Sequence, residues 1–212
     1  MSPLFRSLTV VIALAALATG AYTAFRMRSL ADGTPPDIDA TIFSSARPIP
    51  PFELIDHDGA AFTPERLRGH WTLIFFGFTH CPDVCPTTLH TLARSSALLE
   101  DLPPGRQPEI ILVSVDPERD TVGKLREYVP FFDPSFLGVT GNPEEIDALT
   151  AALGVAHRKI YRDDGDYTVD HSAAIFLIDR NGNQAALFSP PHEAETLARN
   201  YQMSIAYLER QR

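Results

Sequence analysis

The chain has only two cysteines, Cys81 and Cys85, which lie in the sequence THCPDVCP at residues 79–86. A thiolate is both a nucleophile and a soft metal ligand, so the pair could exchange disulfides or hold one metal ion. Because three residues separate them, the sulfur atoms are near neighbours, and a disulfide would require the loop to bend. An inert structural disulfide is the alternative, but closing so small a loop would restrict the unfolded chain little.

The residues on either side of the cysteines predict a strand followed by a helix. Residues 71–77 (WTLIFFG) form a nearly continuous apolar run, which is typical of a strand buried on both faces. Apolar residues then recur at helical spacing from Leu89 to Leu102, and Pro86 suits the first turn of a helix. The cysteines are therefore expected on a strand-to-helix loop, where free backbone amides and the helix dipole favour thiolates.

The rest of the pattern alternates strands and helices, as in an α/β domain. The expected elements are hairpins at 52–63 and around 181–182, buried strands at 109–116 and 173–179, a short strand at 136–140, strands flanking the acidic turn 163–166, and helices at 121–129, 142–154 and 192–212. This order predicts a thioredoxin-like α/β sandwich with an N-terminal hairpin. In such folds a site lies at the carboxyl ends of the strands, so the loop carrying Asp170, His171 and Ser172 is expected near the cysteines.

The N-terminal region has a different character from the domain. No charged residue occurs at 8–25, and Arg6, Arg26 and Arg28 bracket this run, which is about long enough to cross a bilayer. We expect a single membrane-anchor helix within residues 1–28, with a cleaved signal peptide as the alternative. The Pro-rich residues 29–51 are expected to be a linker, and residues 52–212 the folded domain.

Charge and histidine content narrow the possible ligands. A net charge of −9 without a basic run argues against a nucleic-acid surface.

Two thiolates and one imidazole suit copper(I) and can still hold copper(II), whereas structural zinc usually takes a fourth protein ligand. Asp83, His80 and His90 lie near the cysteines in sequence, but surface or loop roles fit them better than ligation. The other histidines besides His171 are expected to be structural or exposed: His57, His70, His157 and His192.

Four ordered motifs give the chain a resemblance to a known family. They are CPDVCP at 81–86, SVDPERD at 114–120, LGVTG at 137–141 and VDHS at 169–172. From about residue 52 to 201 the chain thus resembles the Sco/SenC copper proteins, which help to assemble the CuA centre of cytochrome c oxidase. Residues 157–161 (HRKIY) depart from the family pattern, which more often has a Val and paired tyrosines, and this departure concerns partner contacts on that face.

The resemblance implies roles for individual residues. Cys81, Cys85 and His171 correspond to the copper ligands, and the same thiols can cycle through a disulfide in the family. Carboxylates are expected around the ligands, with Asp170 beside the ligand histidine, Asp116 at the start of the motif that closes the site, and Asp83 between the cysteines. A plain strand-end turn is the alternative for Asp116, and Arg119 is expected to form an ion pair within its own loop.

The function implied by the resemblance is copper delivery and not catalysis. The expected partners are the CuA-bearing subunit of cytochrome c oxidase and periplasmic copper donors or thiol reductants. The expected location is a bacterial inner membrane, with a single-pass anchor and the domain facing the periplasm.

Two classes of enzyme remain as alternatives. A thiol peroxidase would place Thr or Ser three residues before the reactive cysteine and Pro seven before, but relative to Cys85 those positions hold Pro82 and Phe78. A thioredoxin-type oxidoreductase, acting on exported proteins, normally has two residues between its cysteines and a proline facing them. Here three residues intervene, and the His171 loop takes the place of that proline. Thiol-disulfide exchange as a second activity of a copper protein fits better.

Overall fold

The computed structural model describes residues 15–23 and 38–211, which belong to two separate compact units. Residues 15–23 are helical and exposed, and the Thr19 hydroxyl donates a hydrogen bond to the Ala15 carbonyl at 2.8 Å. Among these described residues, no helix combines the length and the apolar character that crossing a membrane requires. Most of the predicted anchor at 1–28, and the first part of the predicted linker, lie outside the described residues.

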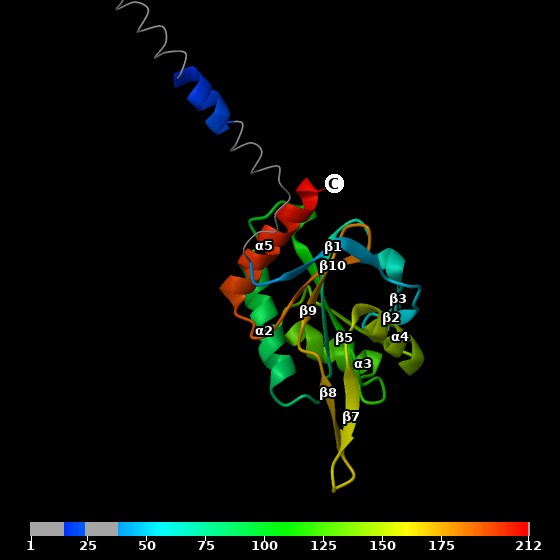
Figure 1. Ribbon diagram of the computed structural model, residues 1–212. Coiled ribbons are helices and arrows are strands. Elements are labelled where there is room, and N and C mark those ends of the chain that lie inside the picture. The colour runs from blue at the N-terminus through cyan, green and yellow to red at the C-terminus, as the bar shows by residue number, and fades with distance from the viewer. Residues whose placement is uncertain (1–14, 24–37, 212) are drawn as a thin grey trace, which may run out of the picture. The chain divides into compact units, whose positions relative to one another are not determined.

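The second unit is built on an eight-stranded mixed sheet in the order β1-β10-β9-β4-β5-β6-β2-β3 (Figure 1). At its centre, β4 pairs in parallel with β5, which pairs in parallel with β6, while β9 runs antiparallel to β4. All seven residues of β4 are buried, as the apolar run predicts. The strands of this sheet are β1 (Thr41–Pro48), β2 (Leu54–Asp56), β3 (Ala61–Phe62), β4 (Trp71–Gly77), β5 (Pro108–Ser114), β6 (Leu137–Gly141), β9 (Ile175–Ile178) and β10 (Asn183–Phe188).

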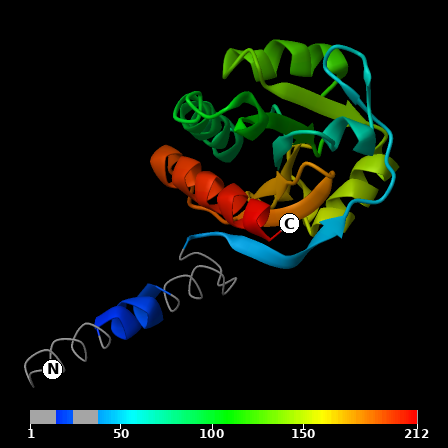
Figure 2. The same ribbon diagram turned by 90° about the horizontal axis from the view of Figure 1, so that it is seen from above.

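Helices cover the sheet on both sides. Helices α2 (Val84–Ala97) and α5 (Ala194–Arg210) pack side by side, whereas α3 (Val122–Tyr128) and α4 (Pro143–Leu153) lie against β6 (Figures 1 and 2). Three short 3-10 helices complete the connections: η1 (Pro64–Leu67), η2 (Pro104–Arg106) and η3 (Val129–Phe131). Helix α4 begins as predicted, because the Asn142 side chain caps the Glu144 amide and Pro143 occupies the first turn. It ends at Gly154, whose φ of 77° is the left-handed conformation that favours glycine.

One expectation about the domain boundary differs from the structure. Residues 41–48, predicted as part of the linker at 29–51, form β1, which pairs antiparallel with β10 at the edge of the sheet. The side chains of β1 are exposed or only partly buried, so the strand lacks the alternating apolar pattern that would reveal it in the sequence. Backbone pairing holds it, and the Asn200 side chain adds a hydrogen bond to the Asp39 carbonyl at 3.1 Å. The folded unit therefore includes residues before 52.

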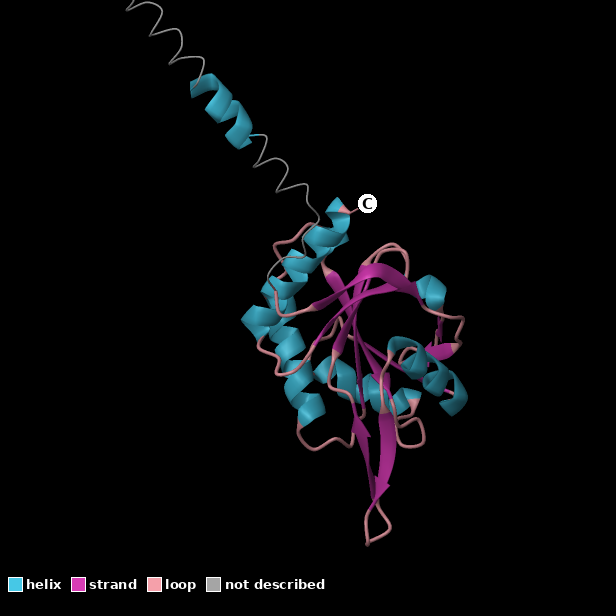
Figure 3. Cartoon of the chain, viewed as in Figure 1, coloured by secondary structure: helices cyan, strands magenta, loops and turns pink. Residues whose placement is uncertain are grey.

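A separate two-stranded sheet projects from the unit as a long hairpin (Figure 3). It consists of β7 (His157–Tyr161) and β8 (Tyr167–His171), paired antiparallel over five residue pairs around the acidic turn. Both strands were expected at these positions. The base of the hairpin leads directly into the core strand β9, which begins beside the end of β4, so the residue that ends β8 lies near the end of β4.

Candidate metal centre

The two cysteines lie between the end of β4 and the first turn of α2. The strand ends at Gly77, Phe78 remains buried behind the loop, and Asp83 is the N-cap residue of α2. Cys85 is fully buried in the first helical turn, whereas Cys81 in the loop is partly exposed. The Cys85 amide donates a hydrogen bond to the Cys81 sulfur at 3.4 Å. The helix N-terminus thus directs a free backbone donor at one of the two sulfurs.

His171 ends β8 and brings its ring to the cysteines. Its Nε2 lies 3.3 Å from the Cys85 sulfur, and its Nδ1 lies 3.1 Å from the Ser172 carbonyl oxygen. Because a carbonyl can only accept, Nδ1 carries a proton in that hydrogen bond, and the lone pair of neutral His171 is then on Nε2, toward the sulfurs. Phe75 and Phe78 pack edge-on to the ring, at centroid distances of 6.1 and 5.8 Å. The imidazole is therefore oriented by both a hydrogen bond and packing.

Cys81, Cys85 and His171 form one group of potential ligands. Their ligand atoms all lie within 4.8 Å of one another, and this is the only such group of three found among the described residues. The two sulfurs come from a loop and the helix that follows it, and the imidazole nitrogen comes from a strand 86 positions further along the chain. Soft donors in a three-coordinate arrangement suit copper(I), so the chemistry of the group fits the predicted cargo.

The two thiols differ strongly in acidity. The pKa of Cys81 is lowered to about 5, chiefly by the hydrogen bond from the Cys85 thiol. The backbone amides of Asp83 and Cys85 and the side chain of His171 also contribute to this lowering, against the effect of burial. The same hydrogen bond, together with burial, raises the pKa of Cys85. At neutral pH the pair therefore holds one negative charge, on the more accessible sulfur.

A buried carboxylate that was not among the predicted site residues holds the cysteine loop in place. Asp120 is fully buried and accepts hydrogen bonds from the Thr79 amide at 2.9 Å, the Thr79 hydroxyl at 2.6 Å and the Ser114 hydroxyl at 2.7 Å. It links the end of β5 to the residue two positions before Cys81. The signal in the sequence was the last residue of the motif SVDPERD, which follows a buried strand.

Asp116 was predicted near the ligands, and the structure places it between the site loop and the hairpin. It is fully buried and accepts a hydrogen bond from the Tyr167 hydroxyl at 2.7 Å. Arg119 pairs with it at 2.5 Å, within the same loop as predicted, and the Arg119 guanidinium also lies 3.8 Å from the centre of the Tyr167 ring. Asp116 therefore anchors the strand that carries His171.

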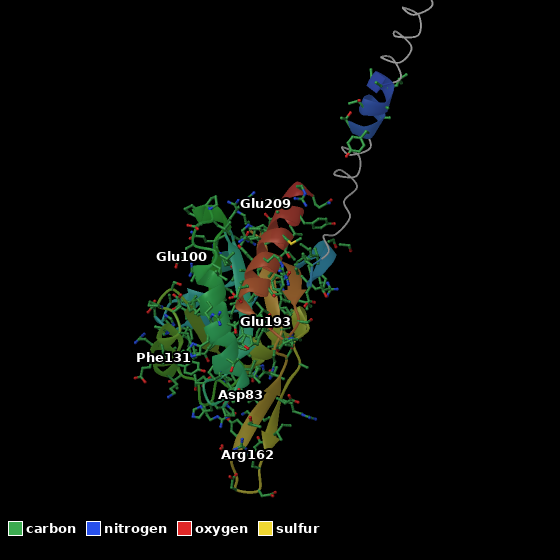
Figure 4. All side chains as sticks on the ribbon, turned by 90° about the vertical axis from the view of Figure 1, so that its left-hand side faces the viewer. Asp83, Glu100, Phe131, Arg162, Glu193 and Glu209 are labelled. Carbon is green, nitrogen blue, oxygen red and sulfur yellow. The ribbon has the colours of Figure 1, made fainter. Side chains whose placement is uncertain are left out.

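The other two predicted carboxylates lie at the surface. Asp170 is exposed, and as the neighbour of His171 in β8 it points to the opposite face of the strand. The Ser172 carbonyl, and not Asp170, holds Nδ1 of His171. The Asp83 carboxylate is also exposed, and the backbone amide of this residue is what faces the Cys81 sulfur. Figure 4 shows Asp83 at the end of α2 that is nearest the hairpin.

The remaining histidines take other contacts. His80 is exposed, with Nδ1 3.9 Å from Asp120, and His90 packs against the Phe132 ring at 4.9 Å. Neither belongs to the ligand group. The histidines expected to be structural are held by these contacts: His57 to the Gly138 amide, His70 to Glu109, His157 to Asp147 and Thr150, and His192 to the Ala173 carbonyl.

Gly77 leaves room for the buried sulfur. A β-carbon at this position would lie 3.0 Å from the Cys85 sulfur, 3.0 Å from the Phe75 ring and 3.2 Å from the Leu112 side chain. These distances are shorter than ordinary carbon contacts, so any side chain there would displace its neighbours. The absence of a side chain at the end of β4 therefore leaves the space that the Cys85 sulfur occupies.

Comparison with known proteins agrees with the geometry. The sequence model of the SCO1/SenC family matches residues 43–206. The chain is 40% identical over 147 residues to the mitochondrial SCO1 homolog 1 of Arabidopsis thaliana, a match covering 69% of this chain and 44% of that protein. It is 42% identical over 134 residues to a SCO2-like protein of Rickettsia prowazekii, covering 62% of this chain and 64% of the relative. The chain thus spans less than two thirds of either relative.

A solved structure shares the fold. The crystal structure of Arabidopsis thaliana ScoI with copper bound superimposes with a TM-score of 0.70 at 38% identity, covering 74% of this chain and 97% of that one. The predicted thioredoxin-like α/β sandwich is thereby confirmed for the domain. The group of two cysteines and one histidine lies within the matched residues.

Proposed function

The chain belongs to the SCO1/SenC family, and from this premise we propose that it binds copper through Cys81, Cys85 and His171 and delivers it to the CuA site of cytochrome c oxidase. The observation that carries the proposal is the convergence of two sulfurs and the Nε2 of His171 within 4.8 Å. Copper is the cargo in this reading, and the chain itself is not an enzyme. The copper-bound relative supports the choice of metal.

The differences between the ligands suggest how they take up and release the ion. Cys81, partly exposed and already a thiolate at neutral pH, is the ligand that an incoming ion meets first. Cys85 releases its proton as the ion binds, and His171 offers the lone pair of Nε2 without losing a proton. An acceptor's ligands reach the copper from the Cys81 side, since Cys85 is buried.

The proposed setting follows the expectations from the sequence. The uncharged run at 8–25 supports an N-terminal anchor in a bacterial inner membrane, with the domain in the periplasm. The partners would be the CuA-bearing oxidase subunit and periplasmic donors of copper or of reducing equivalents.

Copper binding by the full chain, purified in detergent with reduced thiols, tests the proposal. We expect one Cu(I) per chain, and competition with a chromophoric chelator should show affinity losses of at least about tenfold in Cys81→Ser, Cys85→Ser and His171→Ala. His70→Ala is the control, because His70 pairs with Glu109 at the opposite end of β4 and should bind copper like the parent. Parental affinity in all three ligand variants would refute the site. In cells, the ligand variants should lose oxidase activity without losing the oxidase protein.

A second activity, thiol-disulfide exchange, is favoured by the acidity of Cys81. An accessible thiolate beside a buried partner thiol is the arrangement that attacks a disulfide and is then resolved. Turnover of a disulfide substrate by the copper-free chain, absent in Cys81→Ser, would establish it. If turnover were rapid and copper binding weak and indifferent to His171, oxidoreductase would replace copper delivery as the main function.

A further inference from the structure

The register of the hairpin places a second histidine directly opposite the candidate ligand. His157, the first residue of β7, pairs with His171, the last residue of β8. The Ser172 amide donates to the Ala156 carbonyl at 3.0 Å, so the adjacent pair is a hydrogen-bonded one. The two histidines therefore form a non-hydrogen-bonded pair, in which the α-carbons are only about 4.5 Å apart and the side chains leave the same face of the sheet.

Both imidazoles border the same hollow on the surface. One pocket at the base of the hairpin is lined by residues 156–158 and 170–172, which include His157 and His171. His157 retains access to solvent, with 20% of its side chain exposed. His157 therefore shares a face of the hairpin and a pocket with the candidate ligand, and its ring remains accessible.

The His157 ring can move away from its present partners at little cost in free energy. Its Nε2 lies 3.1 Å from the Asp147 carboxylate and 3.2 Å from the Thr150 hydroxyl, both on α4. Asp147 is 67% exposed, so water replaces the ring when it leaves. Thr150 keeps its hydrogen bonds to the carbonyls of Ile146 and Asp147. Asp147 and Thr150 therefore both keep other polar partners when the His157 ring moves away.

The chemistry of copper gives this histidine a use. Copper(I) is satisfied by two or three soft ligands, whereas copper(II) prefers four ligands in a tetragonal arrangement with nitrogen or oxygen among them. Cys81, Cys85 and His171 supply three ligands. We propose that His157 is the fourth ligand for copper(II) and does not bind copper(I), so that this chain holds the two oxidation states with different ligand sets. This inference rests on the proposed copper site.

The signature of the proposal is the number of imidazoles on copper(II), which pulsed electron paramagnetic resonance can count. In the full chain loaded with Cu(II), we expect two imidazoles in the parent and one in His157→Gln. The Cu(II) affinity of His157→Gln should fall about tenfold, while its Cu(I) affinity stays within about twofold of the parent. Glutamine can still bond Asp147 and Thr150, so the hairpin keeps its support.

Two further variants make the test specific. His70→Gln breaks a similar contact between Nε2 and a carboxylate, at 2.8 Å to Glu109, but at the opposite end of β4, and should leave the imidazole count and both affinities unchanged. Asp147→Ala removes the competing partner of His157, so the Cu(II) affinity should equal or exceed that of the parent. A loss of Cu(II) affinity in Asp147→Ala would contradict the proposal.

The result that would overturn the proposal is a single imidazole in the parent, or two imidazoles retained in His157→Gln. This failure is distinguishable from failure of the copper site itself. If His171→Ala weakens binding of both oxidation states while His157→Gln changes neither, only the fourth ligand is refuted. If His171→Ala also binds both states like the parent, the three-ligand site fails.

Discussion

The two halves of the candidate centre are held in different ways. The cysteine half is the loop and first helical turn after β4, and the core of the domain fixes it through the fully buried Cys85 and Asp120. The histidine half is the base of a hairpin that projects from the domain, and polar contacts hold it against the loop at 116–120. The buried sulfur thus has its support in the core, whereas the hairpin that carries the imidazole is held mainly by a few polar contacts.

In the copper transfer that we propose, this difference gives the two halves different roles. A ligand fixed in the core retains the ion, because moving it would disturb packing around Phe75 and Leu112. A ligand on a hairpin can be withdrawn by breaking polar contacts of modest energy, such as that between Lys159 and Glu118 at 2.7 Å. In the proposed transfer, an acceptor that docks on the hairpin therefore loosens His171 without unfolding the cysteine half.

The largest expected effect comes from breaking the support of the cysteine half. Asp120→Ala removes a buried carboxylate that accepts three hydrogen bonds and leaves the Thr79 and Ser114 donors without partners. The free energy of unfolding should fall by about 3 kcal/mol, measured by urea denaturation of the copper-free chain.

A matched control tells whether burial or the number of hydrogen bonds determines this loss of stability. Asp133 accepts two hydrogen bonds from Ser135, at 2.8 and 2.7 Å, in an exposed turn. Asp133→Ala should therefore cost less than about 1 kcal/mol, because water can replace the lost bonds. If both aspartate variants lost equally little stability, the cysteine half would not be the rigid one.

The second effect lies within the cysteine half and depends on pH. Because the pKa of Cys81 is lowered to about 5 and that of Cys85 is raised, a small alkylating agent should modify Cys81 about 100-fold faster at neutral pH. The rate at Cys81 should rise as pH increases through about 5 and then level off. The thiolate form also stabilises the fold, and this contribution is lost as pH falls from the ordinary thiol pKa toward about 5.

Replacing the partner thiol checks the cause of the lowered pKa. Cys85→Ala removes the largest contribution, the hydrogen bond from the Cys85 thiol, so the midpoint of the alkylation profile should move upward, toward the ordinary thiol range. Mass spectrometry of the alkylated peptides gives the rate at each site. Equal rates at Cys81 and Cys85 in the parent would contradict the assignment of the thiolate.

The two halves also differed in how far the sequence could predict them. The cysteine loop was predictable because an apolar run, a proline in the first helical turn and paired cysteines are local patterns. The expected topology placed the His171 loop near the cysteines, but its role as a ligand came from resemblance, since no local signal reports a contact between residues 86 positions apart. The role of Asp120 was missed because its partners, Thr79 and Ser114, come together only in the folded sheet. Strand β1 was missed because backbone pairing leaves little side-chain pattern.

The third effect weakens the histidine half and leaves the core intact. Arg119 joins Asp116 to the hairpin, since its guanidinium lies over the Tyr167 ring and donates to the Tyr167 carbonyl at 3.0 Å. Arg119→Met keeps much of the side-chain volume but removes these contacts. Copper(I) affinity should fall about tenfold, because part of the binding free energy would then offset the cost of ordering His171.

Hydrogen exchange tells where the loosening occurs. In Arg119→Met, amides of β7 and β8 should exchange faster, while those of β4 and α2 keep their protection. Arg94→Met is the control, because Arg94 on α2 forms an exposed ion pair with Glu195 on α5, away from the hairpin. Faster exchange in β4 as well would show that the hairpin and the core open together, and the comparison between the halves would fail.

The smallest effect isolates one hydrogen bond of the hairpin. Tyr167→Phe removes the hydroxyl that donates to Asp116 at 2.7 Å but retains the ring under Arg119 and beside Tyr161. Burial, and then the Asp116 carboxylate, raise the pKa of Tyr167, so the hydroxyl keeps its proton and remains a donor at neutral pH. Its loss should lower the free energy of unfolding by about 1 kcal/mol and the copper affinity by no more than about threefold, because Arg119 still neutralises Asp116.

Tyr161→Phe is the control: it lies on an exposed neighbour in the same hairpin and should change neither the free energy of unfolding nor the copper affinity. If Tyr167→Phe weakened copper binding as much as Arg119→Met, the position of His171 would depend on the hydroxyl and not on the guanidinium, and Asp116 would act on the imidazole through tyrosine.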